Sequence, residues 1–149
     1  MVITKIKGYI EKINPDKTVF IAFDGVAPFA KLEQQRTRRF KSKYIEDIIN
    51  SVSNKKQIKK IWDRTAITPG TKFMNNLTET IKKEFIKNIN IIVSGTDEVG
   101  EGEHKIFNFI RNNKEKHANE VTLVYGLDAD LIMLGLCNSY LCKNIYIYI

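Results

Sequence analysis

The sequence predicts an α/β fold in which helices cover a mostly parallel central sheet. Three short apolar runs rich in β-branched and aromatic residues, 18–23, 89–93 and 121–125, have the composition of buried strands. Segments with helical periodicity separate these runs, and this alternation is typical of parallel sheets with helical crossovers. The length of 149 residues is enough for one domain with a hydrophobic core.

Local patterns justify each element. Isoleucines recur at helical intervals before an Asn-Pro-Asp break at 14–16, and the long stretch after Pro28 lacks glycine and proline, with a polar patch at 51–54 as its candidate interruption. The expected elements, in chain order, are a helix over 1–13, the strand 18–23, a helix over 29–64, a helix over 71–87, the strand 89–93, a helix over 103–112, the strand 121–125, a helix over 131–136 and a strand over 144–149.

The positive charge is concentrated in one segment. Residues 31–64 hold eleven Lys/Arg and four Asp/Glu, which accounts for the whole net charge of +7. This excess favours a polyanionic partner, with a solvated helix face as the alternative. No apolar run approaches the roughly 18–20 residues of a membrane span, and the first residues lack a signal-peptide pattern. Cys137 and Cys142 match no zinc spacing, so we expect reduced core thiols and an intracellular protein without a membrane partner.

Carboxylates follow each of the three predicted buried strands. Asp24 follows the first strand, Glu101 and Glu103 the second, and Asp128 and Asp130 the third. Because the carboxyl ends of parallel strands meet at one edge of a sheet, we expect these five acids to converge there. Five carboxylates suit two Mg²⁺ or Mn²⁺ ions about 4 Å apart, a pair that can drive phosphodiester hydrolysis. The alternative is that the acids cap helix N-termini.

The glycine-rich loop after the second strand is the densest part of this pattern. Its acids Asp97, Glu98, Glu101 and Glu103 lie within seven residues of a chain that is otherwise basic. Such a cluster is costly unless water or a cation neutralises it. We therefore interpret the loop as half of a metal site.

One face of the long basic helix has the chemistry of a phosphate anchor. Lys31, Gln35, Arg38 and Arg39 stand at i, i+4, i+7 and i+8, which places them on the same side of a helix that begins just after Asp24. Arginine forks and a lysine near a metal site are suited to hold the terminal phosphate of a nucleic acid strand. A solvated face remains the alternative.

Four other residues have two interpretations each. Lys105, beside the acids, either steers a phosphate or neutralises the carboxylates. His104 and His117 are expected as surface or helix-facing residues rather than in catalysis, and Trp62 is expected to pack rather than to stack on a base.

Four blocks of sequence together resemble the eukaryotic 5′→3′ exoribonuclease (Xrn) family. They are Phe-Asp-Gly-Val-Ala-Pro at 23–28 with the basic run that follows to residue 40, Ile-Thr-Pro-Gly-Thr at 67–71, Gly-Glu-Gly-Glu-His-Lys-Ile at 100–106, and Gly-Leu-Asp-Ala-Asp-Leu at 126–131. The blocks occur in family order and the resemblance covers about 20–136.

The resemblance implies a PIN-like, flap-nuclease-like three-layer fold and RNA turnover by a hydrolase. Such an enzyme uses Mg²⁺ or Mn²⁺, expected as two ions, to release mononucleotides from single-stranded RNA with a 5′-monophosphate. By motif position, the catalytic, metal-binding acids correspond to Asp24, Glu101, Glu103, Asp128 and Asp130. The 5′-phosphate and RNA pocket corresponds to Lys31, Gln35, Arg38 and Arg39.

The resemblance also implies that the domain is incomplete. The family opens with an Asp-x-Asn-Gly segment that has no counterpart in 1–17, and its catalytic region continues well beyond residue 136. We therefore expect residues 1–149 to form a partial catalytic domain with a motif-bearing core at about 18–136. The alternative function is an RNA-end-binding module that needs a second polypeptide for activity. A cytoplasmic location is expected, with the nucleus as the alternative.

Overall fold

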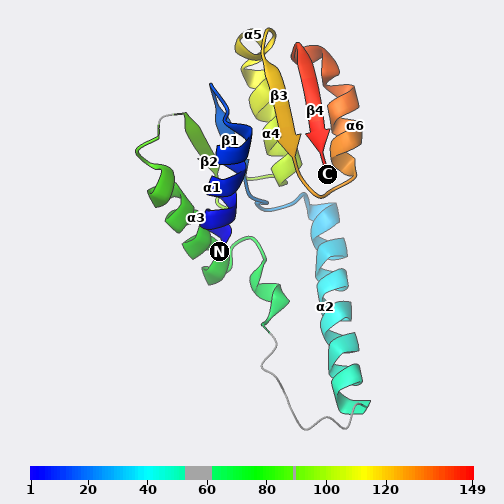
Figure 1. Cartoon of the computed structure of the whole chain (residues 1–149). Coiled ribbons are helices and arrows are strands. Elements are labelled where there is room, and N and C mark those ends of the chain that lie inside the picture. The colour runs from blue at the N-terminus through cyan, green and yellow to red at the C-terminus, as the bar shows by residue number, and fades with distance from the viewer. Residues whose placement is uncertain (53–61, 89) are drawn as a thin grey trace.

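The fold is α/β, as the sequence predicts (Figure 1). The computed structural model describes residues 1–52, 62–88 and 90–149. The elements are α1 (Val2–Ile13), β1 (Val19–Ala22), α2 (Phe29–Val52), the 3₁₀ helix η1 (Arg64–Ala66), α3 (Lys72–Phe85), β2 (Ile91–Ser94), α4 (Gly102–Asn112), α5 (Lys114–His117), β3 (Val121–Tyr125), α6 (Asp130–Cys137), the 3₁₀ helix η2 (Ser139–Leu141) and β4 (Asn144–Tyr148).

The four strands form two separate parallel pairs. β1 pairs with β2, with Val19 opposite Ile91, and β3 pairs with β4, with Val121 opposite Asn144. Parallel pairing requires crossovers, and α2, α3 and α6 supply them. The described residues thus form two two-stranded parallel sheets, whereas the sequence predicts one central parallel sheet.

Helix α4 bridges the two strand pairs. Phe107 and Ile110 on α4 are buried against Val124 of β3, and the ring of Phe109 stacks on Phe20 of β1 with 4.4 Å between ring centroids. The rest of the buried cluster comes from Leu131, Leu141 and Cys142. The carboxyl ends of β1 and β3 are therefore held in a fixed relation by a single helix. The predicted core position is correct for Cys142, whereas Cys137 is exposed; both cysteines are free.

The two faces of the β3–β4 pair are covered unequally. Helices α4 and α6 pack on this face (Figure 1), where Val124 is buried. The opposite face exposes Leu123, Tyr146 and Tyr148. On this face Tyr9 of α1 contacts Tyr125, with 4.8 Å between ring centroids, so the cover is less complete than the three layers that the resemblance implies.

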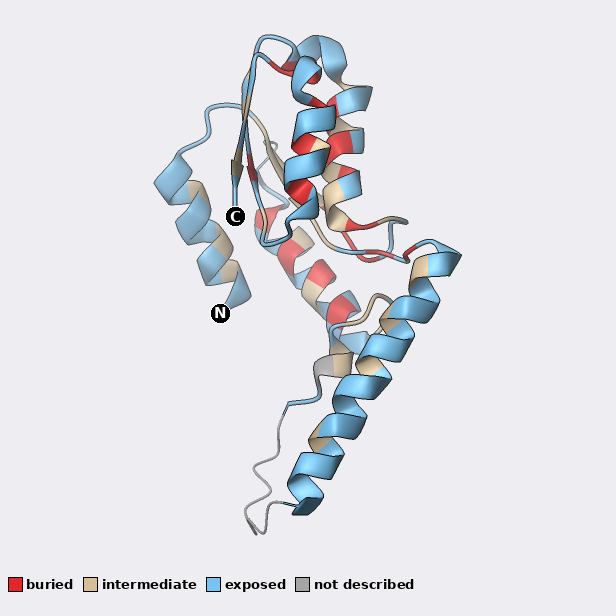
Figure 2. Cartoon of the chain, turned by 90° about the vertical axis from the view of Figure 1, so that its right-hand side faces the viewer, coloured by how far each residue is buried: buried red, intermediate tan, exposed pale blue. Residues whose placement is uncertain are grey.

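Helix α2 projects from the body of the molecule and buries none of its residues (Figure 2). It begins at Phe29, as predicted, but its last described residue is Val52, and the predicted continuation over 53–61 lies outside the described residues. Trp62 is not helical and its ring packs edge-on against Phe73, with 5.3 Å between centroids. This contact matches the packing role expected for Trp62.

The helices contain no candidate membrane span. Among the described residues, none is both long and apolar enough to cross a bilayer.

Candidate metal centre and phosphate anchor

Glu103 lies at the centre of the acidic cluster. Its carboxylate oxygens lie within 4.8 Å of oxygens of Asp128 and Asp130, and the same limit joins Glu103 to Glu101 and His104 in a second group. The two groups share Glu103. The structure thus brings together acids that are up to 29 positions apart in the printed sequence, from the start of α4 and the turn after β3.

Helix starts position these acids. Glu101 is the residue before α4, and Glu103 lies in its first turn. Asp130 begins α6, where its backbone N–H donates to Asp128 Oδ1 at 3.1 Å. The positive end of a helix dipole stabilises carboxylates at such positions. These acids therefore lie at helix N-termini, as in the alternative considered from the sequence, and also converge around Glu103.

Asp24 belongs to neither of these two groups, but a backbone hydrogen bond links it to the start of α4. Its Oδ1 accepts a hydrogen bond from the N–H of Gly102 at 2.7 Å, between the two glutamates. Two further backbone bonds hold the loop after β1 against the acidic loop: Gly25 N–H to Gly100 O at 2.8 Å and Gly100 N–H to Val26 O at 3.1 Å.

Two of these positions require glycine. A Cβ on Gly25 would lie 1.7 Å from the carbonyl oxygen of Glu98, and Gly100 has a φ of +104°. Only glycine tolerates both the close approach and the left-handed conformation. The glycines of the motif therefore allow the two loops to touch.

Electrostatic repulsion within the cluster acts on Glu103. Burial raises the pKa of the Glu103 carboxyl, and the neighbouring charges of Glu101, Asp128 and Asp24 raise it further, while Lys31 acts in the opposite direction. A carboxylate destabilised in this way gains from a nearby cation.

Glu101 has one satisfied and one unsatisfied carboxylate oxygen. Its Oε2 accepts a hydrogen bond from Lys31 Nζ at 2.6 Å, and this bond raises the pKa of Lys31. Its Oε1 is buried and has no partner among the described residues. A buried carboxylate oxygen without a donor is costly, and a hard cation satisfies such an oxygen. The donor set therefore fits Mg²⁺ or Mn²⁺.

The predicted phosphate face lies along the first part of α2. Lys31, Gln35 and Arg39 are half-buried, and Arg38 is exposed. Lys31 is the one member of this set that contacts an acid of the cluster within the described part of the chain. The side chains of Gln35, Arg38 and Arg39 make no hydrogen bond or ion pair with another described residue, so their donors remain free for a ligand.

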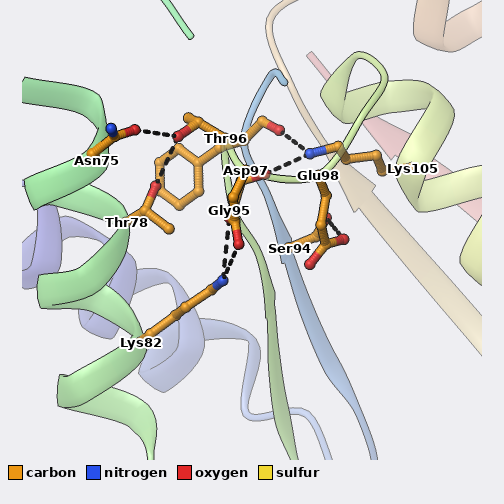
Figure 3. A network of polar contacts seen from close by, with 10 residues as sticks. Asn75, Thr78, Lys82, Ser94, Gly95, Thr96, Asp97, Glu98 and Lys105 are labelled. Atoms are coloured by element: carbon orange, nitrogen blue, oxygen red, sulfur yellow. Dashed lines mark hydrogen bonds and ion pairs between the residues drawn. The ribbon is translucent and has the colours of Figure 1, made fainter. Parts of the chain in front are cut away.

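The acidic loop divides into two parts. Asp97 pairs with Lys82 at 3.1 Å, a hydrogen bond that lowers the pKa of Asp97, and Glu98 accepts from Ser94 Oγ at 2.6 Å (Figure 3). Neither acid belongs to the two carboxylate groups found among the described residues. The interpretation of all four acids as half of a metal site is therefore wrong for Asp97 and Glu98, which anchor the loop.

Lys105 has a role that the sequence does not reveal. It is buried, and its Nζ donates to the carbonyl oxygens of Phe23 at 2.8 Å and Gly95 at 2.6 Å. Burial lowers its pKa. Lys105 thus ties together the ends of β1 and β2, which neither of its two interpretations foresaw. No spacing signals this contact, because it depends on how the strands pair. His104 is exposed, as expected, whereas His117 is buried with its Nδ1 2.6 Å from Glu120 Oε2.

Comparison with known proteins identifies relatives with a shared name. The "5'-3' exoribonuclease 1" of Saccharomyces cerevisiae is 44% identical over 149 residues, which cover 89% of this chain. The human protein of the same name is 43% identical over 155 residues and covers 91% of the chain. The "5'-3' exoribonuclease 2" of Kluyveromyces lactis is 41% identical over 150 residues and covers 83%.

The chain spans only part of these relatives. The matched regions cover 10% of the S. cerevisiae protein, 9% of the human protein and 15% of the K. lactis protein. The family described as "XRN 5'-3' exonuclease N-terminus" matches residues 1–147, which is almost the whole chain. This match and these identities show that the chain belongs to the XRN 5'-3' exonuclease N-terminus family.

Proposed function

We propose that this chain carries much of the active site of a metal-dependent 5′→3′ exoribonuclease. Its substrate is single-stranded RNA with a 5′-monophosphate, which it shortens by one mononucleotide at a time. One observation carries the proposal: the acids around Glu103 lie beside the first turn of a basic helix, where Lys31 contacts Glu101. The names of the relatives agree with this activity.

The metal ligands in this proposal are Asp24, Glu101, Glu103, Asp128 and Asp130. The unsatisfied Oε1 of Glu101 and the raised pKa of Glu103 support a cation at this place. Two overlapping groups that share Glu103, one of which includes His104, suit two ions. When bound, such ions supply activation of a water and stabilisation of the leaving oxygen of the phosphodiester.

The basic face of α2 anchors the substrate. Arg38 and Arg39 offer planar guanidinium forks for a terminal phosphate, and Lys31 and Gln35 offer further donors. α2 begins within a few residues of Asp24. In this proposal a phosphate held on its basic face is therefore near the acids, and the first internucleotide linkage is the bond that is cleaved. Anchoring of the strand end thus favours stepwise release of single nucleotides.

The two strand pairs are, in this proposal, parts of one PIN-like, flap-nuclease-like sheet. Both pairs are parallel, α4 packs on both, and the outer face of β3–β4 is apolar and exposed. The expected setting is RNA turnover in the cytoplasm, with the nucleus as the alternative.

The test compares degradation of a 5′-monophosphorylated RNA and its 5′-hydroxyl counterpart, with Mg²⁺ or Mn²⁺. We expect degradation of the phosphorylated RNA alone and a loss of at least about 100-fold in the Asp128→Ala variant. Ser139→Ala, at an exposed position outside the site, is the matched control. If the Asp128→Ala variant and the unmodified chain degrade the RNA equally well, the acids around Glu103 are not the active site.

The second candidate is an RNA-end-binding module that needs another polypeptide for cleavage. The separation of the described strands into two pairs favours it. Calorimetric titration with a 5′-phosphorylated oligoribonucleotide, with and without Mn²⁺, separates the two candidates when combined with the cleavage assay. Tight binding without turnover supports the module.

A further inference from the structure

We propose that Lys31 couples metal binding to phosphate binding: it occupies Glu101 when the cluster holds no cation and is released to the 5′-phosphate when a divalent ion takes Glu101. The inference rests on the proposed function and adds the order in which metal and phosphate bind. Metal loading comes first and creates the full phosphate anchor.

The geometry of the Lys31–Glu101 pair supports this coupling. The ammonium lies 2.6 Å from Oε2 of a carboxylate whose side chain is 7% exposed, whereas the Lys31 side chain is 43% exposed. The acid is therefore fixed within the protein, and the lysine reaches it from the solvent side. Lysine has a flexible four-carbon stem, so it can leave this position without movement of the helix backbone.

A lysine and a divalent ion compete for the same carboxylate. Both are cations, and at about 4 Å two charges repel strongly in a partly buried site. The other oxygen of Glu101 is buried and has no partner within residues 1–52, 62–88 and 90–149, so a cation bound there also weakens the attraction of Oε2 for the ammonium. Arrival of the metal therefore disfavours the ion pair, and the released ammonium becomes a donor for the phosphate.

The other members of the phosphate face lack this contact. Arg38 lies seven residues further along α2, about 10 Å along the helix axis, and has no ion pair with a described residue. Its affinity for phosphate does not depend on a break in its own ion pair. The coupling is thus specific to Lys31, which makes Arg38 the informative comparison.

The first measurement is calorimetric titration of Mn²⁺ into the full chain and its variants. In Lys31→Met the metal does not have to displace an ammonium from Glu101, so we expect about three- to tenfold tighter Mn²⁺ binding. Lys41→Met, which removes an exposed charge from the same helix, is the control and leaves the Mn²⁺ affinity within about twofold. Unchanged or weaker Mn²⁺ binding by Lys31→Met overturns the proposal.

The second measurement is the affinity for adenosine 5′-monophosphate, which has a terminal phosphate and no phosphodiester to cleave. We expect saturating Mn²⁺ to tighten binding of this nucleotide about tenfold in the unmodified chain. In Lys31→Met the tightening factor is expected to be smaller by at least about threefold. Arg38→Met weakens binding with and without Mn²⁺ by a similar factor and so keeps the full coupling. Equal coupling in Lys31→Met and the unmodified chain overturns the proposal.

A second pair of variants tests the same step from the acid side. Glu101→Gln removes the charge that holds Lys31. The control is Glu103→Gln, because Glu103 has no hydrogen bond to Lys31. Without metal, we expect Glu101→Gln to bind adenosine 5′-monophosphate about threefold more tightly than Glu103→Gln does. The reverse order contradicts the inference. If neither Mn²⁺ nor the nucleotide binds the unmodified chain, the proposed function itself fails; if both bind but the coupling does not depend on Lys31, only the inference fails.

Discussion

Asp24 accepts a hydrogen bond from the backbone N–H of Gly102 at 2.7 Å, which joins the end of β1 to the first residue of α4. The same carboxylate lies close enough to Glu103 to raise its pKa. One side chain therefore serves both the local structure and the charge of the cluster. These two roles can be separated, because the hydrogen bond needs an oxygen acceptor whereas metal binding needs the negative charge.

Substitution of Asp24 tests this separation. Asp24→Asn keeps an acceptor for Gly102, so we expect a free energy of unfolding within about 0.5 kcal/mol of the unmodified chain, whereas Asp24→Ala costs about 1 kcal/mol. Both variants are expected to bind Mn²⁺ more weakly. Urea unfolding without metal and calorimetry with Mn²⁺ measure the two effects. Equal destabilisation by Asn and Ala contradicts the assigned hydrogen-bonding role.

Lys105 is expected to matter for stability rather than for phosphate binding. Lys105→Met removes two charge-assisted hydrogen bonds and leaves the carbonyl oxygens of Phe23 and Gly95 without this donor. We expect a loss of about 2–4 kcal/mol in the free energy of unfolding. The control is Lys82→Met, which breaks an ion pair that is 40% and 63% exposed and costs at most about 1 kcal/mol. Similar losses in urea unfolding of the two variants argue against a structural role for Lys105.

The local elements were predictable because their signals are local. Apolar runs located β1, β2 and β3 to within a few residues. Four of the five predicted acids also converge around Glu103, although β2 and β3, the strands before them, lie in different pairs. The metal role of these acids and the phosphate role of the α2 face stay predictions.

The pairing of the strands was not predictable from the same patterns. A buried strand has the same apolar composition whether it has one neighbour or two, so nothing in 121–125 signals the free edge of β3. The division of the acidic loop was hidden for a similar reason. Asp97 pairs with Lys82 from α3, a contact set by how α3 docks beside β2 rather than by the loop sequence.

The phosphate face predicts discrimination between RNA ends. Arg38 has an exposed guanidinium without a protein partner among the described residues, so its donors are available to a ligand. Arg38→Ala is expected to weaken binding of a 5′-phosphorylated oligoribonucleotide about tenfold, because a charge-assisted contact is lost, and to change binding of the 5′-hydroxyl form by less than about twofold. Fluorescence anisotropy with both oligonucleotides measures this difference. A uniform loss for both ends points to general backbone attraction instead.

The raised pKa of Glu103 gives the stability of the metal-free protein a defined pH dependence. The folded protein binds a proton at Glu103 more readily than the unfolded chain, so the ionised side chain opposes folding above its raised pKa. Glu103→Gln removes that penalty, and we expect a gain of up to about 1 kcal/mol at pH 7, after allowance for solvent screening. The gain shrinks as the pH falls through the raised pKa and vanishes below the ordinary value of 4.5. Thermal unfolding of both proteins across this range, without metal, measures it.

Saturating Mn²⁺ is expected to reverse this comparison. A bound cation stabilises the ionised form of Glu103 and, by mass action, the folded state that binds it, so the unmodified chain then unfolds at the higher temperature. The reversal shows whether Glu103 binds the metal or is only crowded by other acids. If Glu103 is a ligand, Mn²⁺ stabilises the unmodified chain more than it stabilises Glu103→Gln. If Glu103→Gln is the less stable protein at pH 7 without metal, repulsion among the acids does not dominate at this position, and the electrostatic argument for a cation loses its support.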